Sequence, residues 1–131
     1  MKKILFDNQM FTFQRFGGVT RYFADLIYNL PADEFEASLP MHFCENHYIT
    51  ETYKQNFSSF SFPGSYRLRR RLYQPVNRLF AWRALRKGNY DIFHPTYFSP
   101  YSLGALEKNK KPFVPTVHDM VFARYPQDVL I

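Results

Sequence analysis

Two histidines and a pair of glycines are the residues whose types and positions best suit chemistry in this sequence. His94 and His118 each stand at the end of a short apolar run, YDIFHP and KPFVPTVHDM, and imidazole has an unperturbed pKa close to neutrality. Gly17 and Gly18 separate an apolar run from a regular amphipathic stretch. A glycine turn that opens a helix presents unpaired N–H groups and a positive dipole end to an anion. The turn therefore suggests a phosphate or sugar site.

Several common sites lack their sequence patterns here. The dinucleotide fingerprint G-x-G-x-x-G and the P-loop pattern G-x-x-x-x-G-K-[ST] are both absent. No Asp-x-Asp pair occurs, so the sequence offers no such ligand pair for a divalent cation. Cys44 is the only cysteine, which excludes an internal disulfide and a cysteine-based metal site and fits a reducing compartment. We expect no metal and no cofactor.

The elements that would position the glycines and histidines can be predicted from periodicity. We expect a strand over 3–6 and a helix from Gly18 to Asn29, ended by Pro31. The apolar positions of that helix follow the spacing of a face lying on a sheet, namely Val19, Tyr22, Phe23, Leu26, Ile27 and Leu30. Further strands are expected over 35–44, 56–62, 90–94 and 111–120, with Pro115 inside the last.

A long basic stretch predicts the second main helix, from Leu68 to Arg86, with Gly88 as its C-cap. Pro75 should kink or divide this helix, because proline removes a backbone hydrogen bond and clashes with the preceding turn. The predicted core-facing stripe consists of Leu68, Leu72, Val76, Leu79 and Phe80.

The order of these elements predicts an α/β fold with an open parallel sheet and flanking helices. In such sheets ligands bind outside the carboxyl ends of the strands. That rule places the Gly17–Gly18 turn, His94 and His118 along one edge.

Length and composition limit the remaining possibilities. The 131 residues suit one compact domain, and 46% of them are apolar, so the chain should fold. The net charge of +6 permits nucleic acid, an anionic membrane surface or phosphorylated substrates as partners. No run approaches the roughly 20 apolar residues that a membrane span needs, so we expect a soluble or peripheral protein.

Three blocks of the sequence resemble the N-terminal Rossmann-like domain of GT-B glycosyltransferases of retaining family 4. They are ILFDNQMFTFQRFGGVTRYFADLI, YDIFHPTYFSPY and PTVHDMVFARYP, and the likeness is greatest to bacterial surface-polysaccharide members. The resemblance implies transfer of a sugar from a nucleotide-sugar donor to a glycan or lipid-linked acceptor. It also implies a cytoplasmic enzyme, peripheral at the inner face of the membrane.

The resemblance implies a role for the histidine and the glycines. His118 and Asp119 match the family's His-Asp pair after an apolar strand, so His118 would contact the transferred sugar or assist proton movement from the acceptor hydroxyl. The alternative is that the two residues only fix the loop by hydrogen bonds. Gly17 and Gly18 would allow both the turn and the approach of backbone amides to the donor's diphosphate or sugar, since neither carries a Cβ.

Five further residues belong to the predicted site. Arg15 and Arg21 flank the glycines and would stabilise the leaving nucleotide, unless they are merely solvated charges. His94, Thr96 and Tyr97 would bind the acceptor. Many relatives have a second histidine where Thr96 stands, which weakens a base role for this loop.

The domain that would hold the donor is not expected within this chain. In the family a C-terminal domain binds the nucleotide-sugar, and its paired glutamates, with seven residues between them, have no counterpart here. We therefore expect residues 1–131 to be a truncated acceptor-side domain that is inactive alone.

A second class of function is also open. The stretch from Arg67 to Lys87 could lie on an anionic membrane or track nucleic acid in a binding module without catalysis. No nucleic-acid motif supports the second of these partners. The same stretch can also be a crossover helix with solvated charges.

Overall fold

A parallel three-stranded sheet organises the chain in a computed structural model that describes residues 1–49, 57–58, 60–97, 99–120 and 124. Strand β1 (Lys2–Phe6) lies between β2 (Phe35–Ser38) and β3 (Ile92–His94). Lys2 is opposite Phe35, and Phe6 is opposite His94. The α/β class and the parallel arrangement expected from the sequence are confirmed.

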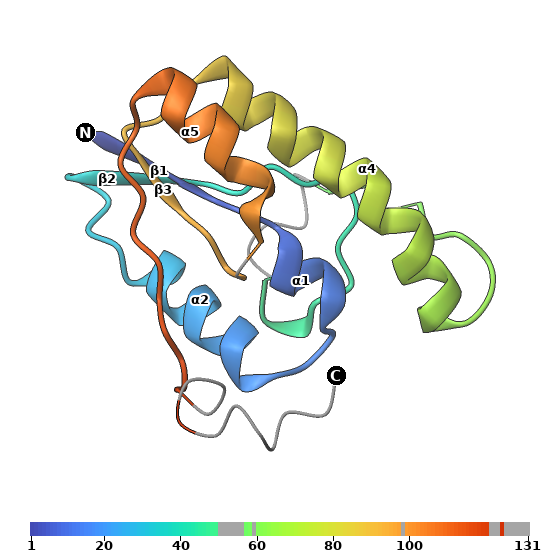
Figure 1. The fold of residues 1–131 in the computed structure, drawn as a ribbon. Coiled ribbons are helices and arrows are strands. Elements are labelled where there is room, and N and C mark those ends of the chain that lie inside the picture. Colours follow the sequence, from blue (N-terminus) through green and yellow to red (C-terminus); the bar gives the residue numbers. More distant parts are fainter. Residues whose placement is uncertain (50–56, 59, 98, 121–123, 125–131) are drawn as a thin grey trace.

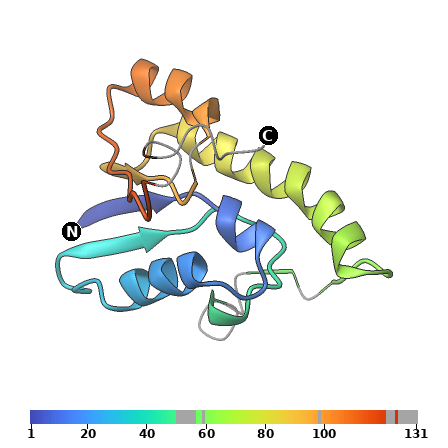
Figure 2. The ribbon, with the colours of Figure 1, turned by 60° about the horizontal axis from the view of Figure 1, so that its bottom comes forward.

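Helices cover both faces of this sheet (Figures 1 and 2). Helix α2 (Gly18–Tyr28) packs against one face, and α4 (Tyr66–Lys87) and α5 (Leu103–Asn109) cover the other. Alternate residues of β1 supply the two cores, as a pleated strand requires. The α2 side is formed by Ile4, Phe6, Phe11, Phe23, Ala24, Ile27, Met41 and Ile49, and the α4 side by Leu5, Leu85, Tyr90, Phe93 and Leu106.

Short helical segments, among them α1, η2 and α5, lie where the sequence predicted none. Helix α1 (Gln9–Phe13) follows β1 directly and buries Met10, Phe11 and Thr12. A single 3-10 turn, η2 (Pro100–Ser102), leads into the seven-residue α5. Segments this short have little hydrophobic periodicity of their own, so tertiary packing determines them.

The sheet is smaller than the sequence predicted. The strand expected over 35–44 ends at Ser38, and the described residues of 56–62 form no strand. The run 111–120 makes one parallel bridge, between Phe113 and Phe93. Pro112 and Pro115 flank this bridge and have no N–H to donate to a ladder, so the pairing does not extend.

Helix α4 is continuous through Pro75, which neither ends nor divides it. The Ser65 side chain accepts a hydrogen bond from the Leu68 N–H at the first turn, and Gly88 ends the helix with φ 69°. Pro75 is exposed. The carbonyl that lacks a helical partner there can therefore be solvated.

The buried face of α4 is not the predicted stripe. Tyr73, Asn77, Ala81 and Leu85 are buried, whereas Leu68 is 48% exposed and Leu79 is 43% exposed. Asn77 is fully buried because its side chain is fully used: Oδ1 accepts from His42 N and Phe43 N, and Nδ2 donates to Thr12 Oγ1 and Phe43 O. A polar side chain whose hydrogen bonds are all made thus lies at the centre of the buried face, where helical periodicity predicts an apolar residue.

Candidate functional site

The carboxyl ends of β1 and β3 meet at one edge of the sheet, and the candidate site is built there. The Asp7 N–H donates to His94 O at 3.3 Å, so the two strand ends are held together. The Asp7 side chain then accepts from Thr96 N at 3.0 Å, from Thr96 Oγ1 and from Gln9 N at 3.3 Å. One carboxylate therefore fixes the start of the loop after β3 and the start of α1.

Asp7 was missed by the sequence reading. It is 1% exposed, and burial raises the pKa of its carboxyl, although the hydrogen bonds from Thr96 and Gln9 oppose that rise. Oδ2 makes no hydrogen bond of normal geometry to any residue that the structure describes. The available signal was an acidic residue directly after a buried strand, at the end where ligands bind.

The His94 side chain is buried under the candidate site and is not part of its surface. Its ring stacks on Phe6 at 5.3 Å and meets Phe23 edge-on, and Nε2 is 2.9 Å from Thr116 Oγ1. Burial lowers the pKa of His94, and the nearby charge of His118 lowers it further. With 8% exposure, this histidine can act on a ligand only through its neighbours.

His118 is exposed and is positioned by aromatic rings of α2. Tyr22 meets its ring edge-on at 5.3 Å and Phe23 does so at 5.6 Å. Tyr22 lies at the outer edge of α2 and is 43% exposed. Its ring therefore supports His118 and does not fill the core. Such edge-to-face contacts orient a ring without occupying its nitrogen atoms.

A cavity of about 200 Å³ lies between this histidine and the first turn of α2. Its polar wall comes from Thr96, Tyr97, Thr116, His118 and Asp119, and its apolar wall from Met10, Val19, Pro95 and Pro115. We call it the His118 cavity. Four predicted site residues, far apart in the sequence, are thus brought together.

The glycine pair lies at the start of α2, next to Val19 of the cavity wall. No side chain caps this first turn, because Gly17 is the N-cap residue. Gly17 has φ 165°, which is extended backbone open to any residue, so the expectation that the turn itself needs glycine is wrong. The side-chain amide of Gln14 occupies the space that a Cβ at Gly17 would need, whereas nothing lies within 4 Å of a Cβ at Gly18. The approach to Gly18 is therefore open.

The two predicted arginines lie outside the cavity wall. Arg15 is exposed, with its guanidinium 5.5 Å from the Tyr66 ring centroid and 5.9 Å from that of Phe16. Arg21 is exposed on α2 and stands 3.8 Å from Asp25. Both can contribute positive potential near the helix start, but neither contacts the His118 cavity.

The His118 cavity combines an imidazole, a carboxylate, hydroxyl groups and the start of a helix. Such a set can accept a proton, hydrogen-bond sugar hydroxyls and favour an anion. Within the described ranges, no three or more His, Cys, Asp and Glu side chains are grouped so as to hold a metal ion.

Comparison with known proteins gives one family. The sequence model of Glycosyltransferase Family 4 matches residues 16–130, a span that includes every predicted site residue except Arg15. No curated protein matches the chain, and no solved structure does.

Proposed function

This chain belongs to glycosyltransferase family 4, and on that premise we propose that it forms the acceptor-side domain of a retaining glycosyltransferase. The proposed enzyme moves a sugar from a nucleotide-sugar donor to a glycan or lipid-linked acceptor, as in bacterial surface-polysaccharide assembly. The observation that carries the proposal is the cavity in which His118 and Asp119 face the first turn of α2.

The donor's sugar or phosphate is proposed to sit against the start of α2. Breaking the glycosidic bond builds negative charge on the nucleotide, and helix N–H groups aimed at that charge stabilise the transition state. Gly18 leaves the approach open, and Arg15 and Arg21 add positive field from either side. No metal or cofactor is needed for this mode of stabilisation.

The donor's remaining part is proposed to lie outside the His118 cavity. Pockets for drug-sized ligands usually measure about 300–1,000 Å³, whereas this cavity has about 200 Å³. It suits one sugar or phosphate group. A second domain that holds the nucleotide would complete the binding site.

His118 is proposed to contact the transferred sugar and to carry the proton of the attacking hydroxyl. Its ring is exposed at the cavity and held from behind by Tyr22 and Phe23. Thr96 and Tyr97 would hold the acceptor, with His94 acting through Thr116. Proton transfer by a positioned side chain typically contributes about 10²–10⁴-fold to a rate.

A membrane surface is the proposed location of this reaction, on its cytoplasmic side. Helix α4 carries eight basic and no acidic residues over 66–87. Its outer face also exposes Leu68, Leu72, Leu79 and Trp82, at 39–48%. Apolar side chains among cations are what an interfacial helix presents to anionic lipid. None of the helices in the described residues is long and apolar enough to cross a membrane.

The test is a transfer assay on the protein that contains this domain together with a donor-binding domain. His118→Ala should lower kcat/KM by about 10²-fold or more, as loss of a proton-transfer group does. His47→Ala is the matched control, because His47 is another exposed histidine packed on an aromatic ring, 5.2 Å from Phe16. Equal activity of wild type and His118→Ala, with nucleotide release as the readout, would overturn the assignment.

A further inference from the structure

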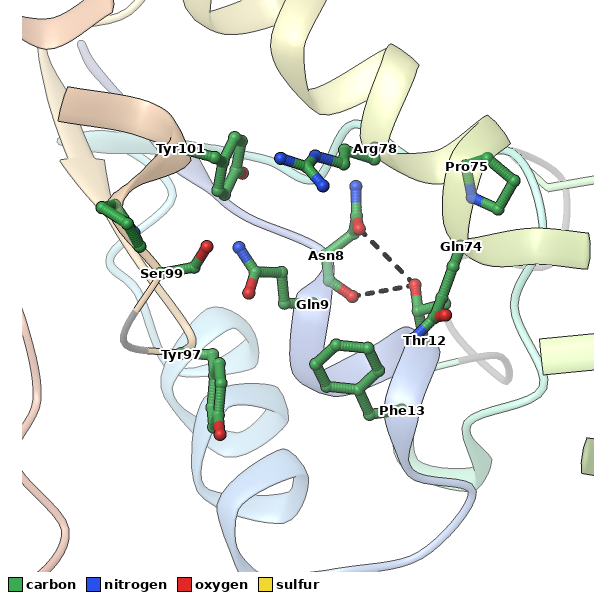
Figure 3. A pocket seen from close by; sticks show the side chains of 11 residues that line it. Asn8, Gln9, Thr12, Phe13, Gln74, Pro75, Arg78, Tyr97, Ser99 and Tyr101 are labelled. Carbon is green, nitrogen blue, oxygen red and sulfur yellow. Dashed lines mark hydrogen bonds between the residues drawn. The ribbon is translucent and has the colours of Figure 1, made fainter. Parts of the chain in front are cut away.

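A second and larger cavity adjoins the His118 cavity. It has a volume of about 520 Å³ and lies between α1, α4 and the residues Tyr97, Ser99, Pro100 and Tyr101 (Figure 3). Tyr97 lines both cavities. The volume falls within the range of pockets that hold small ligands. We call this the Arg78 cavity.

The wall of the Arg78 cavity has the composition of a saccharide site. Phe13 and Tyr97 meet edge-on, with ring centroids 5.9 Å apart. Gln9 and Gln74 add side-chain amides, which can donate and accept hydrogen bonds with hydroxyl groups. An apolar ring beside several amides matches the two kinds of surface on a pyranose ring.

Among the described residues that line this wall, Arg78 is the one that carries a charge. Its guanidinium lies 5.7 Å from the Tyr101 ring centroid, and Figure 3 shows it reaching from α4 toward that ring. No ion pair of Arg78 occurs within the part of the chain that the structure describes. The cavity therefore holds a positioned cation with unused donors and no acidic residue in its wall.

A second observation also indicates a ligand here. The Tyr101 hydroxyl is buried without a hydrogen bond of normal geometry to a described residue, and the side chains of Gln9 and Asp7 are its polar neighbours. Asn8, in contrast, is satisfied, since its Nδ2 donates to Pro40 O and Asn77 O at 2.8 Å each. The cavity wall thus combines a rigid side, fixed by Asn8, with polar groups that are available to a ligand.

We propose that the Arg78 cavity binds a negatively charged sugar, and that Arg78 selects for its carboxylate or phosphate group. The inference rests on the proposed function, since the charged sugar would belong to an acceptor whose attacking hydroxyl lies in the adjoining His118 cavity. A guanidinium binds either anion with paired N–H donors, and the flat ring of Tyr101 holds it in place.

The test is direct binding to the chain without any donor. The probes are methyl β-D-glucuronide, glucose 6-phosphate and the neutral methyl β-D-glucoside, titrated while the side-chain amide signals of Gln9 and Gln74 are followed by NMR. One charged sugar should bind at least about tenfold more tightly than the neutral one, as a charge-assisted hydrogen bond allows. The anion preferred identifies a uronic-acid or a phosphorylated acceptor.

Two variants locate the effect. Arg78→Gln should remove the preference for the charged sugar, and Arg83→Gln should keep it, because Arg83 is exposed on the same helix and lies outside the cavity wall. Equal binding of charged and neutral sugars, no binding of either, or equal losses in the two variants would overturn the proposal. Because no transfer is measured, an inactive enzyme would contradict the proposed function and leave this binding result standing.

Discussion

At the residue scale, Asp7 joins the walls of two cavities through one side chain. It holds Thr96, which lines the His118 cavity, and the N–H of Gln9, which lines the Arg78 cavity. The carboxylate is buried, and its Oδ2 has no hydrogen bond of normal geometry within the described residues. Asp7 therefore supports the site at a cost to the stability of the fold.

Replacing Asp7 should separate its support of the site from its cost to the stability of the fold. The pKa of the Asp7 carboxyl is higher in the folded state than in the unfolded state, because the buried charge is disfavoured. The free energy of unfolding therefore falls as the pH rises from the unfolded-state pKa to the folded-state pKa. Asp7→Asn keeps an oxygen acceptor for Thr96 and should unfold at a higher denaturant concentration than wild type at pH 7. That advantage should shrink as the pH falls below about 4, where the unfolded carboxyl is protonated too.

The control for this prediction is Asp7→Ala. It leaves the N–H groups of Thr96 and Gln9 without their side-chain acceptor, at a cost of about 1–3 kcal/mol for each buried group left unpaired, while the Thr96 hydroxyl keeps only the Asp7 backbone oxygen at 3.5 Å. Urea unfolding of the three proteins at pH 7 and pH 3.5 would measure both effects. An Asp7→Asn protein that is less stable than wild type at pH 7 would show that the charge is compensated.

At the element scale, the first turn of α2 and the outer face of α4 are surfaces that the fold leaves available. The Gly18→Val substitution should raise KM for the donor and so lower kcat/KM in the complete enzyme, because a branched side chain would occupy the approach to the helix amides. The fold should persist, since nothing lies within 4 Å of a Cβ there. Gly104→Val is the matched control, because Gly104 also stands near a helix start with open space around its Cβ.

Thermal unfolding and donor KM would check the Gly18 prediction. Both valine variants should melt within a few degrees of wild type, since single exposed helix substitutions usually change stability by about 0.5 kcal/mol. Only Gly18→Val should raise KM for the donor. If both variants retain full activity, the donor does not approach α2.

The outer face of α4 should bind anionic vesicles by two separable contributions. Arg67→Gln with Arg71→Gln should weaken the salt-sensitive part, by about 1 kcal/mol for each basic residue replaced. Leu72→Ser with Trp82→Ser should remove the part that survives about 1 M salt, where the Debye length falls to about 3 Å. Sedimentation with phosphatidylglycerol vesicles, with neutral vesicles as control, measures both. Unchanged binding in both double variants would exclude this face.

At the scale of the whole molecule, the domain presents both cavities at one edge of a small sheet. The chain of residues 1–131 alone should release no nucleotide from sugar donors, because the His118 cavity admits only part of a donor. Fusion to a donor-binding domain should restore turnover by placing the reacting groups together. Robust turnover by the chain alone would show that the donor site lies within it.

How far the sequence could predict this architecture depends on how much periodicity each segment carries. β1 was predicted closely because its apolar run ends at Asp7, and α2 because its regular apolar spacing is bounded by glycine and proline. The stripe of α4 was wrong because Asn77, a polar side chain, occupies the buried face. The described residues of 56–62 form no strand, because the alternation there reflects aromatic packing, as between Phe62 and Phe43, rather than a ladder.

Part of the candidate site could also be predicted from the sequence. His118, Asp119, Thr96 and Tyr97 come together because they follow elements that end at one sheet edge. The Arg78 cavity depends on α1, which is too short to be predicted, and on Arg78, which looks in the sequence like any other charge of a basic helix. Only the packed structure distinguishes it.

The position of Tyr97 couples the binding free energies of the two cavities, because its ring lines both and is 48% exposed. A ligand that packs on this ring in either cavity would restrict it further, and the first to bind would meet the entropic cost of doing so. The second then binds a side chain that is already ordered, so the two occupancies should be positively cooperative. By linkage the effect is reciprocal: saturating one cavity should tighten binding in the other by the same factor whichever is filled first, and titrations in both orders would measure it.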